Sequence, residues 1–277
     1  MKFSILIPTW NNFPFLKLCI RSIQENSSFD HQVLVHLNES DPLIREYLEK
    51  SGIEFTESPV NIGICKALNR IYEKATCDYI VYMNDDMYCL PGWDHPLMEE
   101  IKGLNTSSFM LSSTMIEPVH TKNEAVIVAD FGKEIETFDE NALLAQYPSF
   151  VHPDWSGSSW PPNIVHRSMW EKLGGYNEAF SPGMSSDDDF SMRMWLAGCR
   201  IFKGVSKSRV YHFQCKSTGR IVKNDGRKQF LDLYGMSSNT FNTFFLRKGK
   251  PFRGVLRPPS TFNISWQVKR FLSSLAG

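Results

Sequence analysis

An apolar segment that ends on two adjacent carboxylates constrains the fold of this chain more than any other feature of its sequence. Residues 79–83 are Tyr-Ile-Val-Tyr-Met, and Asn84, Asp85 and Asp86 follow directly. β-Branched and aromatic residues in such a run are typical of a buried strand. Ligands of open α/β sheets bind outside the carboxyl ends of the strands, and two oxygen donors there suit Mg²⁺ or Mn²⁺ with a phosphate-bearing substrate. On its own, the segment is as consistent with a simple turn before residues 91–92.

The sequence before this segment alternates strand-like and helix-like patterns. We expect strands at residues 3–7, 32–37 and 53–56, because each is a short run rich in apolar or β-branched residues. Apolar residues recur at helical spacing after each of these strands, and Pro42 begins the second helix. The connections are short. This order predicts an α/β fold with a mostly parallel, doubly wound central sheet flanked by helices.

The sequence after residue 103 is less regular. Residues 109–111 and 125–128 are apolar stretches whose pairing the sequence does not define, and residues 201–205 and 208–213 are expected to form a closing pair of strands.

A loop is predicted at residues 155–162, which are rich in Gly, Pro and Ser. It contains Trp155 and Trp160. Such indoles anchor a loop by packing or stack against the apolar face of a sugar ring, and we favour packing.

Three consecutive carboxylates, Asp187, Asp188 and Asp189, precede a predicted helix that stops at Gly198. Acidic residues at a helix N-terminus can simply cap the helix and complement its dipole. One carboxylate is sufficient for that purpose, whereas three neighbours repel one another and favour a raised pKa suited to a general base. We therefore expect one of the three to have a catalytic role.

Composition agrees with a soluble enzyme. The chain has 277 residues, of which 42% are apolar, and its formal net charge is zero, which argues against nucleic-acid binding through a broad field. Its six cysteines lack C-x-x-C spacing, as expected for reduced thiols in the cytoplasm. The sequence has no signal-peptide pattern and no apolar run near the roughly 18 residues that span a bilayer.

The C-terminal residues 221–277 are basic and rich in aromatic side chains. One interpretation is an amphipathic segment that packs on the catalytic domain through Trp266, Phe271 and Leu272. The other is a basic, apolar patch that rests on the inner face of an anionic membrane, where a lipid-linked acceptor would lie. We favour packing.

Several of these segments, taken together and in order over residues 3–220, resemble the inverting GT-A glycosyltransferases of family 2. The matching segments are residues 5–11, residues 38–41, residues 61–63 with Asn69, residues 84–86 at the place of the D-x-D motif, residues 174–180 and residues 187–193. Two positions depart from the family pattern, because Asn84 stands where the family usually has Asp and Ser186 where it commonly has Glu.

The resemblance implies a GT-A, Rossmann-like fold and transfer of a sugar, with inversion, from a nucleoside-diphosphate sugar to an acceptor hydroxyl. The donor would be UDP-linked, the acceptor a saccharide or a lipid-linked saccharide, and the cofactor Mn²⁺ or Mg²⁺. Asp86 and His212 would bind the metal, and Asp187 or Asp188 would be the general base. The residues implied to contact the nucleotide sugar are Pro8, Thr9, Asn11, Glu39, Asn61, Lys66, Asn84, Asp85 and Lys216.

We expect a catalytic domain over residues 1–220, with a donor half at 1–102 and an acceptor half at 103–220, followed by the extension at 221–277. Two alternatives remain. A sugar nucleotidyltransferase usually has a glycine-rich, basic loop after the first strand, and residues 8–12 contain neither Gly nor Lys. A non-catalytic nucleotide-binding or saccharide-binding protein is suggested by Asn84 and Ser186 in place of acids.

Overall fold

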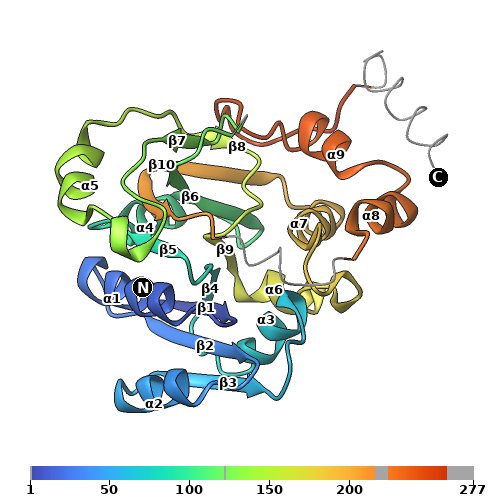
Figure 1. Cartoon of the computed structure of the whole chain (residues 1–277). Coiled ribbons are helices and arrows are strands. Elements are labelled where there is room, and N and C mark those ends of the chain that lie inside the picture. Colours follow the sequence, from blue (N-terminus) through green and yellow to red (C-terminus); the bar gives the residue numbers. More distant parts are fainter. Residues whose placement is uncertain (1, 122, 216–223, 261–277) are drawn as a thin grey trace.

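Helices cover both faces of one mixed β-sheet in the computed structural model of the chain (Figure 1). The structure describes residues 2–121, 123–215 and 224–260. Within these residues the sheet has ten strands in the order β3-β2-β1-β4-β9-β6-β10-β5, with β7 beside β6 and β8 beside β10. The predicted α/β architecture with a central sheet flanked by helices is confirmed.

Strands and helices alternate strictly through the first third of the chain. The elements are β1 (Phe3–Thr9), α1 (Phe13–Asn26), β2 (Gln32–Asn38), α2 (Pro42–Lys50), β3 (Glu54–Ser58), α3 (Ile64–Tyr72) and β4 (Tyr79–Tyr82). All pairings among these strands are parallel. The expected start of α2 at Pro42 is reinforced by Asp41, whose side chain accepts hydrogen bonds from two backbone amides of the first turn.

The rest of the sheet mixes parallel and antiparallel strands. Its elements are β5 (Met87–Cys89), α4 (Asp94–Gly103), β6 (Phe109–Glu117), β7 (Val126–Val128), α5 (Glu140–Gln146), β8 (Trp155–Ser156), β9 (Asn163–His166), α6 (Arg167–Leu173), α7 (Ser186–Leu196), β10 (Ile201–His212), α8 (Gly226–Tyr234) and α9 (Ser238–Phe244). Short 3₁₀ turns lie at Ile135–Thr137, Tyr147–Ser149 and Glu178–Phe180. β9 runs antiparallel to β4 and β6, and β5 runs antiparallel to β10.

Residues 201–213 differ from the expected pair of strands. They contain one long strand, β10, whose register against β6 shifts between Val205 and Arg209. An irregularity of this kind bends a strand without reversing it. The hydroxyls of Ser113 on β6 and Ser208 lie 2.6 Å apart, so a buried hydrogen bond joins the two strands at this irregularity.

The Asp triplet also differs slightly from the prediction. Helix α7 begins at Ser186, so Asp187 to Asp189 form its first turn and do not precede it. The helix ends at Leu196, and Gly198 follows with a φ of 100°.

The core lies on both faces of the sheet because strand side chains alternate. Ile5 and Ile7 of β1 pack in the cluster that includes Leu16 and Ile20 of α1. Leu6 lies on the opposite face, in the cluster formed with α3, α6 and α7. This alternation is the expected consequence of the two-residue repeat of a strand.

The described part of the C-terminal extension packs on the second face. Phe230 of α8 and Phe241 of α9 are fully buried, and Phe241 lies edge-on to Trp195 of α7 with ring centroids 6.2 Å apart (Figure 1). Trp266, Phe271 and Leu272 lie outside the described residues. Among the described helices, none combines the length and the apolar character needed to cross a bilayer.

Candidate active site

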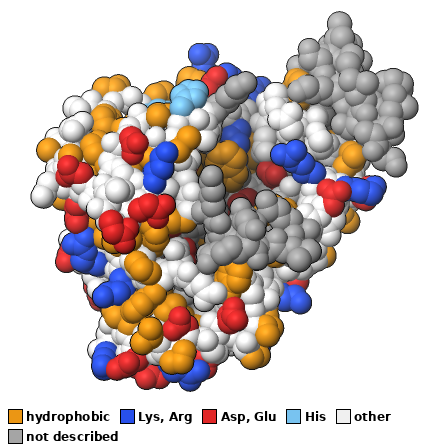
Figure 2. Space-filling model, viewed as in Figure 1, with side chains coloured by type: hydrophobic (Ala, Val, Ile, Leu, Met, Phe, Trp, Pro, Cys, Tyr) orange, Lys and Arg blue, Asp and Glu red, His pale blue; other side chains and the backbone are white. Residues whose placement is uncertain are grey.

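A cavity of about 1040 Å³ opens at the carboxyl ends of the parallel strands and extends to α7 and to the segment after α9. Its walls include Thr9 at the end of β1, Asn38 at the end of β2 and residues 84–86 after β4. On the face shown in Figure 2, acidic and basic side chains of the described residues are intermixed. Attraction of a charged ligand therefore depends on groups inside the cavity more than on a broad surface field.

Asp85 is held by the last residue of β1 and by the loop that follows it. Its Oδ2 accepts a hydrogen bond of 2.6 Å from Thr9 Oγ1, and its Oδ1 accepts one of 3.0 Å from Asn12 Nδ2. Burial and the neighbouring charge of Asp86 raise the pKa of Asp85 to about 7. Because both oxygens already have donors, Asp85 ties the end of β4 to the end of β1.

Asp86, His212 and Glu117 meet because of strand register. Antiparallel pairing places His212 of β10 opposite Met87, and parallel pairing places Tyr211 opposite Ile116 of β6. His212 Nε2 lies 3.5 Å from Asp86 Oδ2, and His212 Nδ1 lies 2.9 Å from Glu117 Oε1. Glu117 thus accepts a hydrogen bond from the Nδ1–H group and directs Nε2 toward Asp86.

The electrostatics of this group follow from its charges. Burial lowers the pKa of His212, but the carboxylates of Asp86 and Glu117 together raise it above its usual value. Asp86 is 6% exposed, and its Oδ2 also accepts a hydrogen bond of 2.8 Å from the backbone amide of Cys215.

A carboxylate oxygen and an imidazole nitrogen that face each other are suitable ligands for Mn²⁺. Across residues 2–121, 123–215 and 224–260, no three His, Cys, Asp or Glu side chains are arranged to hold a metal ion by themselves. Mg²⁺ and similar ions commonly use one or two protein ligands and complete their shell with substrate phosphates and water. A second carboxylate that orients the imidazole, as Glu117 does, is usual for metal-ligating His. Asp86 and His212 therefore fit an ion that a diphosphate also binds.

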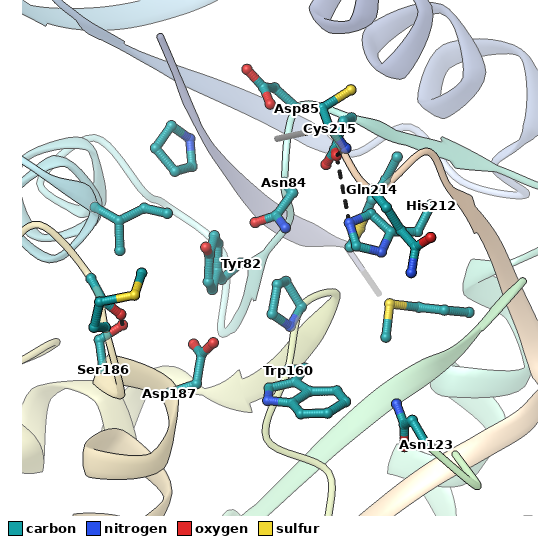
Figure 3. A pocket seen from close by; sticks show the side chains of 18 of the residues that line it. Tyr82, Asn84, Asp85, Asn123, Trp160, Ser186, Asp187, His212, Gln214 and Cys215 are labelled. Atoms are coloured by element: carbon teal, nitrogen blue, oxygen red, sulfur yellow. Dashed lines mark hydrogen bonds and ion pairs between the residues drawn. The ribbon is translucent and has the colours of Figure 1, made fainter. Parts of the chain in front are cut away.

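Asp187 is the carboxylate of α7 that lines the cavity. Its Oδ1 accepts a hydrogen bond of 3.2 Å from the hydroxyl of Tyr176. Burial, followed by the charge of Asp188, raises the pKa of Asp187 to about 7, and Lys248 opposes this rise. In Figure 3, Asp187 and His212 lie on opposite sides of the cavity. A group with such a pKa can exchange a proton near neutral pH.

The two neighbouring carboxylates have other partners. Asp188 Oδ1 accepts a hydrogen bond of 2.8 Å from Asn242 Nδ2, and its side chain is not among those that line the cavity. Asp189 is fully buried and is bound by the Tyr234 hydroxyl at 2.6 Å and by Arg193 Nε at 2.8 Å. Asp189 thus joins α7 to α8 and leaves Asp187 as the triplet member exposed to a ligand.

A close approach at Gly63 joins the N-terminal half of the site to the loop before α7. A Cβ at Gly63 would lie 2.7 Å from Pro182 Cα, and the Ile64 amide donates to the Pro182 carbonyl at 3.0 Å. Only glycine fits there, because its φ is 79° and there is no room for a side chain.

The structure brings together only some of the predicted nucleotide-sugar contacts. Pro8, Thr9, Asn61, Asn84 and Asp85 line the cavity. Three others, Asn11, Glu39 and Lys66, are exposed and do not line it. Glu39 reaches the site only indirectly, through a hydrogen bond of 2.6 Å from Trp10 Nε1. Lys216 lies outside the described residues.

Several lining residues carry chemistry that the sequence did not single out. They include Glu117, Lys248 and Asn242. Trp160 also lines the cavity, whereas Trp155 is buried and donates to Thr114 Oγ1 at 2.9 Å. The predicted packing role therefore fits Trp155, while Trp160 faces the space that a ligand would occupy.

Two buried acceptors at the cavity have no partner within the described residues. They are Gln214 Oε1 and Asn242 Oδ1. Buried polar atoms are normally hydrogen-bonded. A ligand that carries hydroxyl groups would satisfy both.

Comparisons with known proteins identify the family and the fold. The sequence model described as Glycosyl transferase family 2 matches residues 4–161. Residues 1–349 of TarS from S. aureus, solved with UDP, share 16% identity at a TM-score of 0.56, over 76% of this chain and 60% of that one. The same fragment solved with UDP-GlcNAc shares 17% identity at a TM-score of 0.56, over 76% of this chain and 58% of that one. GalNAc-T7, solved with UDP, GalNAc and Mn²⁺, shares 13% identity at a TM-score of 0.59, over 87% of this chain and 46% of that one.

At these identities the structural likeness establishes the fold. This chain covers 60% of the TarS fragment's length. No curated protein matches the sequence significantly.

Proposed function

The chain belongs to glycosyl transferase family 2 and is a glycosyltransferase of the GT-A fold, and we propose that it takes its sugar from a UDP-sugar. The sugar would pass, with inversion, to a hydroxyl of a saccharide or lipid-linked acceptor. The observation that carries this proposal is that one cavity contains both the Asp86–His212 pair and the partly buried carboxylate of Asp187. The first suits a diphosphate with its metal ion, and the second suits a base.

The donor side is assigned to the walls formed by residues 1–102. Thr9, Asn38 and Asn61 would line the nucleoside pocket, with Asn84 and Asp85 nearer to the ribose or the sugar. The presence of UDP in the structures of the TarS fragment and of GalNAc-T7 supports a uridine donor.

Asp86 and His212 are the residues that would hold Mn²⁺ or Mg²⁺. When bound, the ion would neutralise the negative charge that develops on the leaving diphosphate. Glu117 fixes the ring of His212, so the ligand geometry is prepared before the donor arrives. The Mn²⁺ in the GalNAc-T7 structure supports this choice of ion.

Asp187 would accept the proton of the acceptor hydroxyl. As that proton leaves, the hydroxyl oxygen forms a bond to the anomeric carbon, and the bond from this carbon to the diphosphate oxygen breaks on the opposite face. Attack from the opposite face inverts the configuration. Asn242 Oδ1 and Gln214 Oε1 would accept hydrogen bonds from sugar hydroxyls.

A panel of nucleotide sugars tests the proposal, read first by thermal unfolding with and without Mn²⁺. A UDP-sugar should raise the Tm only when Mn²⁺ is present, because the ion would hold the diphosphate. The rise should be easy to measure, since a ligand at a hundred times its Kd adds about 2.7 kcal/mol to the free energy of unfolding. UDP release in the presence of saccharide acceptors should then follow. Asp187→Asn should bind the donor as the wild type does but release UDP poorly, with Asp188→Asn as the matched control.

The outcomes separate the alternatives. UDP-sugar binding without UDP release under any acceptor would favour a non-catalytic binding protein. Release of pyrophosphate from UTP and a sugar phosphate would instead favour a nucleotidyltransferase. Equal turnover of the wild type and both variants would exclude the acceptor-side assignment.

A further inference from the structure

Helix α9 presents an uncharged polar face to the cavity. Its seven residues are only Ser, Asn, Thr and Phe. Asn239, Asn242 and Thr243 line the cavity, and their spacing of three and four places them on one side of the helix. Phe241 is fully buried and lies edge-on to Trp195 of α7. The helix is therefore anchored by an aromatic side chain and offers amide and hydroxyl groups to a ligand.

The orientation of the Asn242 amide is fixed by its partner. Its Nδ2 donates to Asp188 Oδ1 at 2.8 Å. An ionised carboxylate accepts hydrogen bonds and cannot donate them, so the amide nitrogen must face Asp188 and the amide oxygen must face away from it. The backbone carbonyl of Asn242 is already used, because the Lys248 amide donates to it at 3.0 Å. The side-chain oxygen, Oδ1, is buried and has no partner among the described residues.

A buried acceptor of this kind needs a donor, because leaving it unpaired costs free energy. A ligand in the cavity would have to supply an O–H or N–H group at this point. Asp188 follows Asp187 in the first turn of α7, so Asn242 lies at the end of the cavity that holds the proposed base. The group that meets Oδ1 would therefore belong to the acceptor and not to the nucleotide.

We propose that Asn242 determines which acceptor the enzyme uses, by accepting a hydrogen bond from a neutral sugar hydroxyl that neighbours the attacking one. A neutral sugar fits because the residues of α9 carry no charge. The inference rests on the proposed function, since it needs Asp187 to be the base. Helix α9 lies outside residues 4–161, the part of the chain that matches the family model. Acceptor choice is thereby assigned to a helix of the C-terminal extension.

The size of the effect follows from the buried oxygen. A sugar that lacks the recognised hydroxyl leaves Oδ1 unpaired, and a site built to bind a substrate hydroxyl rejects the analogue without it. An unpaired buried group weakens binding by roughly 10- to 100-fold. We therefore expect the wild type to bind one deoxy sugar that much more weakly than its parent sugar. Asn242→Ala should bind the two sugars with similar affinity, because it has no amide oxygen to satisfy.

Ligand-observed NMR of the full chain with UDP and Mn²⁺ tests this expectation without turnover. The test ligands are the methyl glycosides of glucose, galactose and N-acetylglucosamine, each with its single-deoxy analogues. Their Kd values are compared for the wild type, Asn242→Ala and Ser238→Ala. Ser238 lies on α9 but does not line the cavity, so Ser238→Ala is the control and should discriminate as the wild type does. If Asn242→Ala does not fold, Asn242→Ser replaces it, since a serine hydroxyl can still donate to Asp188.

Three results would overturn the inference. They are equal discrimination by the wild type and Asn242→Ala, loss of discrimination in Ser238→Ala, and failure of the wild type to bind any of the glycosides. The affinity for UDP with Mn²⁺ should be the same in all three proteins, and a parallel loss of UDP binding in Asn242→Ala would show a general structural role instead.

Measurement of UDP release separates this inference from the proposed function. Glycoside binding without UDP release from any UDP-sugar would refute the proposed transfer, even where Asn242 discriminates between the sugars. Release of UDP by the wild type, together with unchanged discrimination in Asn242→Ala, would refute the Asn242 inference alone.

Discussion

Replacing Asp187 by Asn should remove turnover and at the same time stabilise the folded protein at neutral and alkaline pH. Burial and the charge of Asp188 raise the pKa of this carboxyl from 3.8 to about 7. The folded state therefore binds the proton more tightly than the unfolded state does. At pH values below the pKa of the unfolded state, the side chain is protonated in both states and costs the folded state no stability. As the pH rises from there to the pKa of the folded state, the free energy of unfolding falls.

The magnitude follows from the size of the shift. One pKa unit corresponds to about 1.4 kcal/mol, so a shift of roughly three units would amount to about 4 kcal/mol above pH 7. Asp187 keeps some solvent exposure, which screens its charge, so we expect about 2–4 kcal/mol. The advantage of Asp187→Asn should grow by up to about 1.4 kcal/mol per pH unit between the unfolded and folded pKa values and stay constant above them.

Urea unfolding at a series of pH values measures this slope directly. Asp188→Asn is the matched control and should gain less stability than Asp187→Asn, because its amide oxygen can still accept from Asn242 and only the repulsion that Asp188 exerts on Asp187 is removed. UDP release should fall by roughly 10²–10⁴-fold in Asp187→Asn. If the difference in free energy of unfolding between Asp187→Asn and the wild type is the same at about pH 4 and pH 7, the reasoning is refuted, whatever the size of that difference.

Three further predictions concern the metal and the C-terminus. Asp86→Ala should abolish Mn²⁺-dependent binding of UDP while the protein stays folded, and unchanged affinity by calorimetry would contradict the metal assignment. Glu117→Gln should weaken Mn²⁺ binding about 10–100-fold, because the ring of His212 loses its carboxylate partner, whereas Glu124→Gln should not change it. If the C-terminus rests on a membrane, truncation before Pro258 should abolish sedimentation with anionic vesicles and leave the Tm unchanged. We expect instead that the full chain does not sediment with vesicles and that the truncated protein has a lower Tm than the full chain.

The local elements of the first half could be predicted because the signal is local. Apolar runs, helical spacing and a proline at the start of α2 determine each element within a few residues. The position of Asp85 and Asp86 shortly after the end of β4 follows from the same pattern. The parallel order then places the ends of β1, β2 and β4 at one edge, as the sequence suggests.

The other half of the site depends on pairing between distant residues. Glu117 reaches His212 because β6 and β10 are parallel neighbours, although 95 positions separate the two residues. The apolar run at residues 109–111 indicates a strand but contains nothing that selects its partner. The turn that carries Lys248 is fixed by backbone hydrogen bonds between Ser156 and both Gly249 and Lys250, which no side-chain pattern reveals.

The continuity of β10 has a mechanical consequence. This strand has 12 residues, begins shortly after the helix that carries Asp187 and ends at His212. The register shift between Val205 and Arg209 bends the strand without interrupting it. Hydrogen bonds to β6 on one side and to β5 on the other prevent it from flexing as a hinge. His212, the last residue of this strand, is thereby held in place by the sheet, so a ligand that contacts the imidazole must adapt to its position because the strand cannot move toward the ligand.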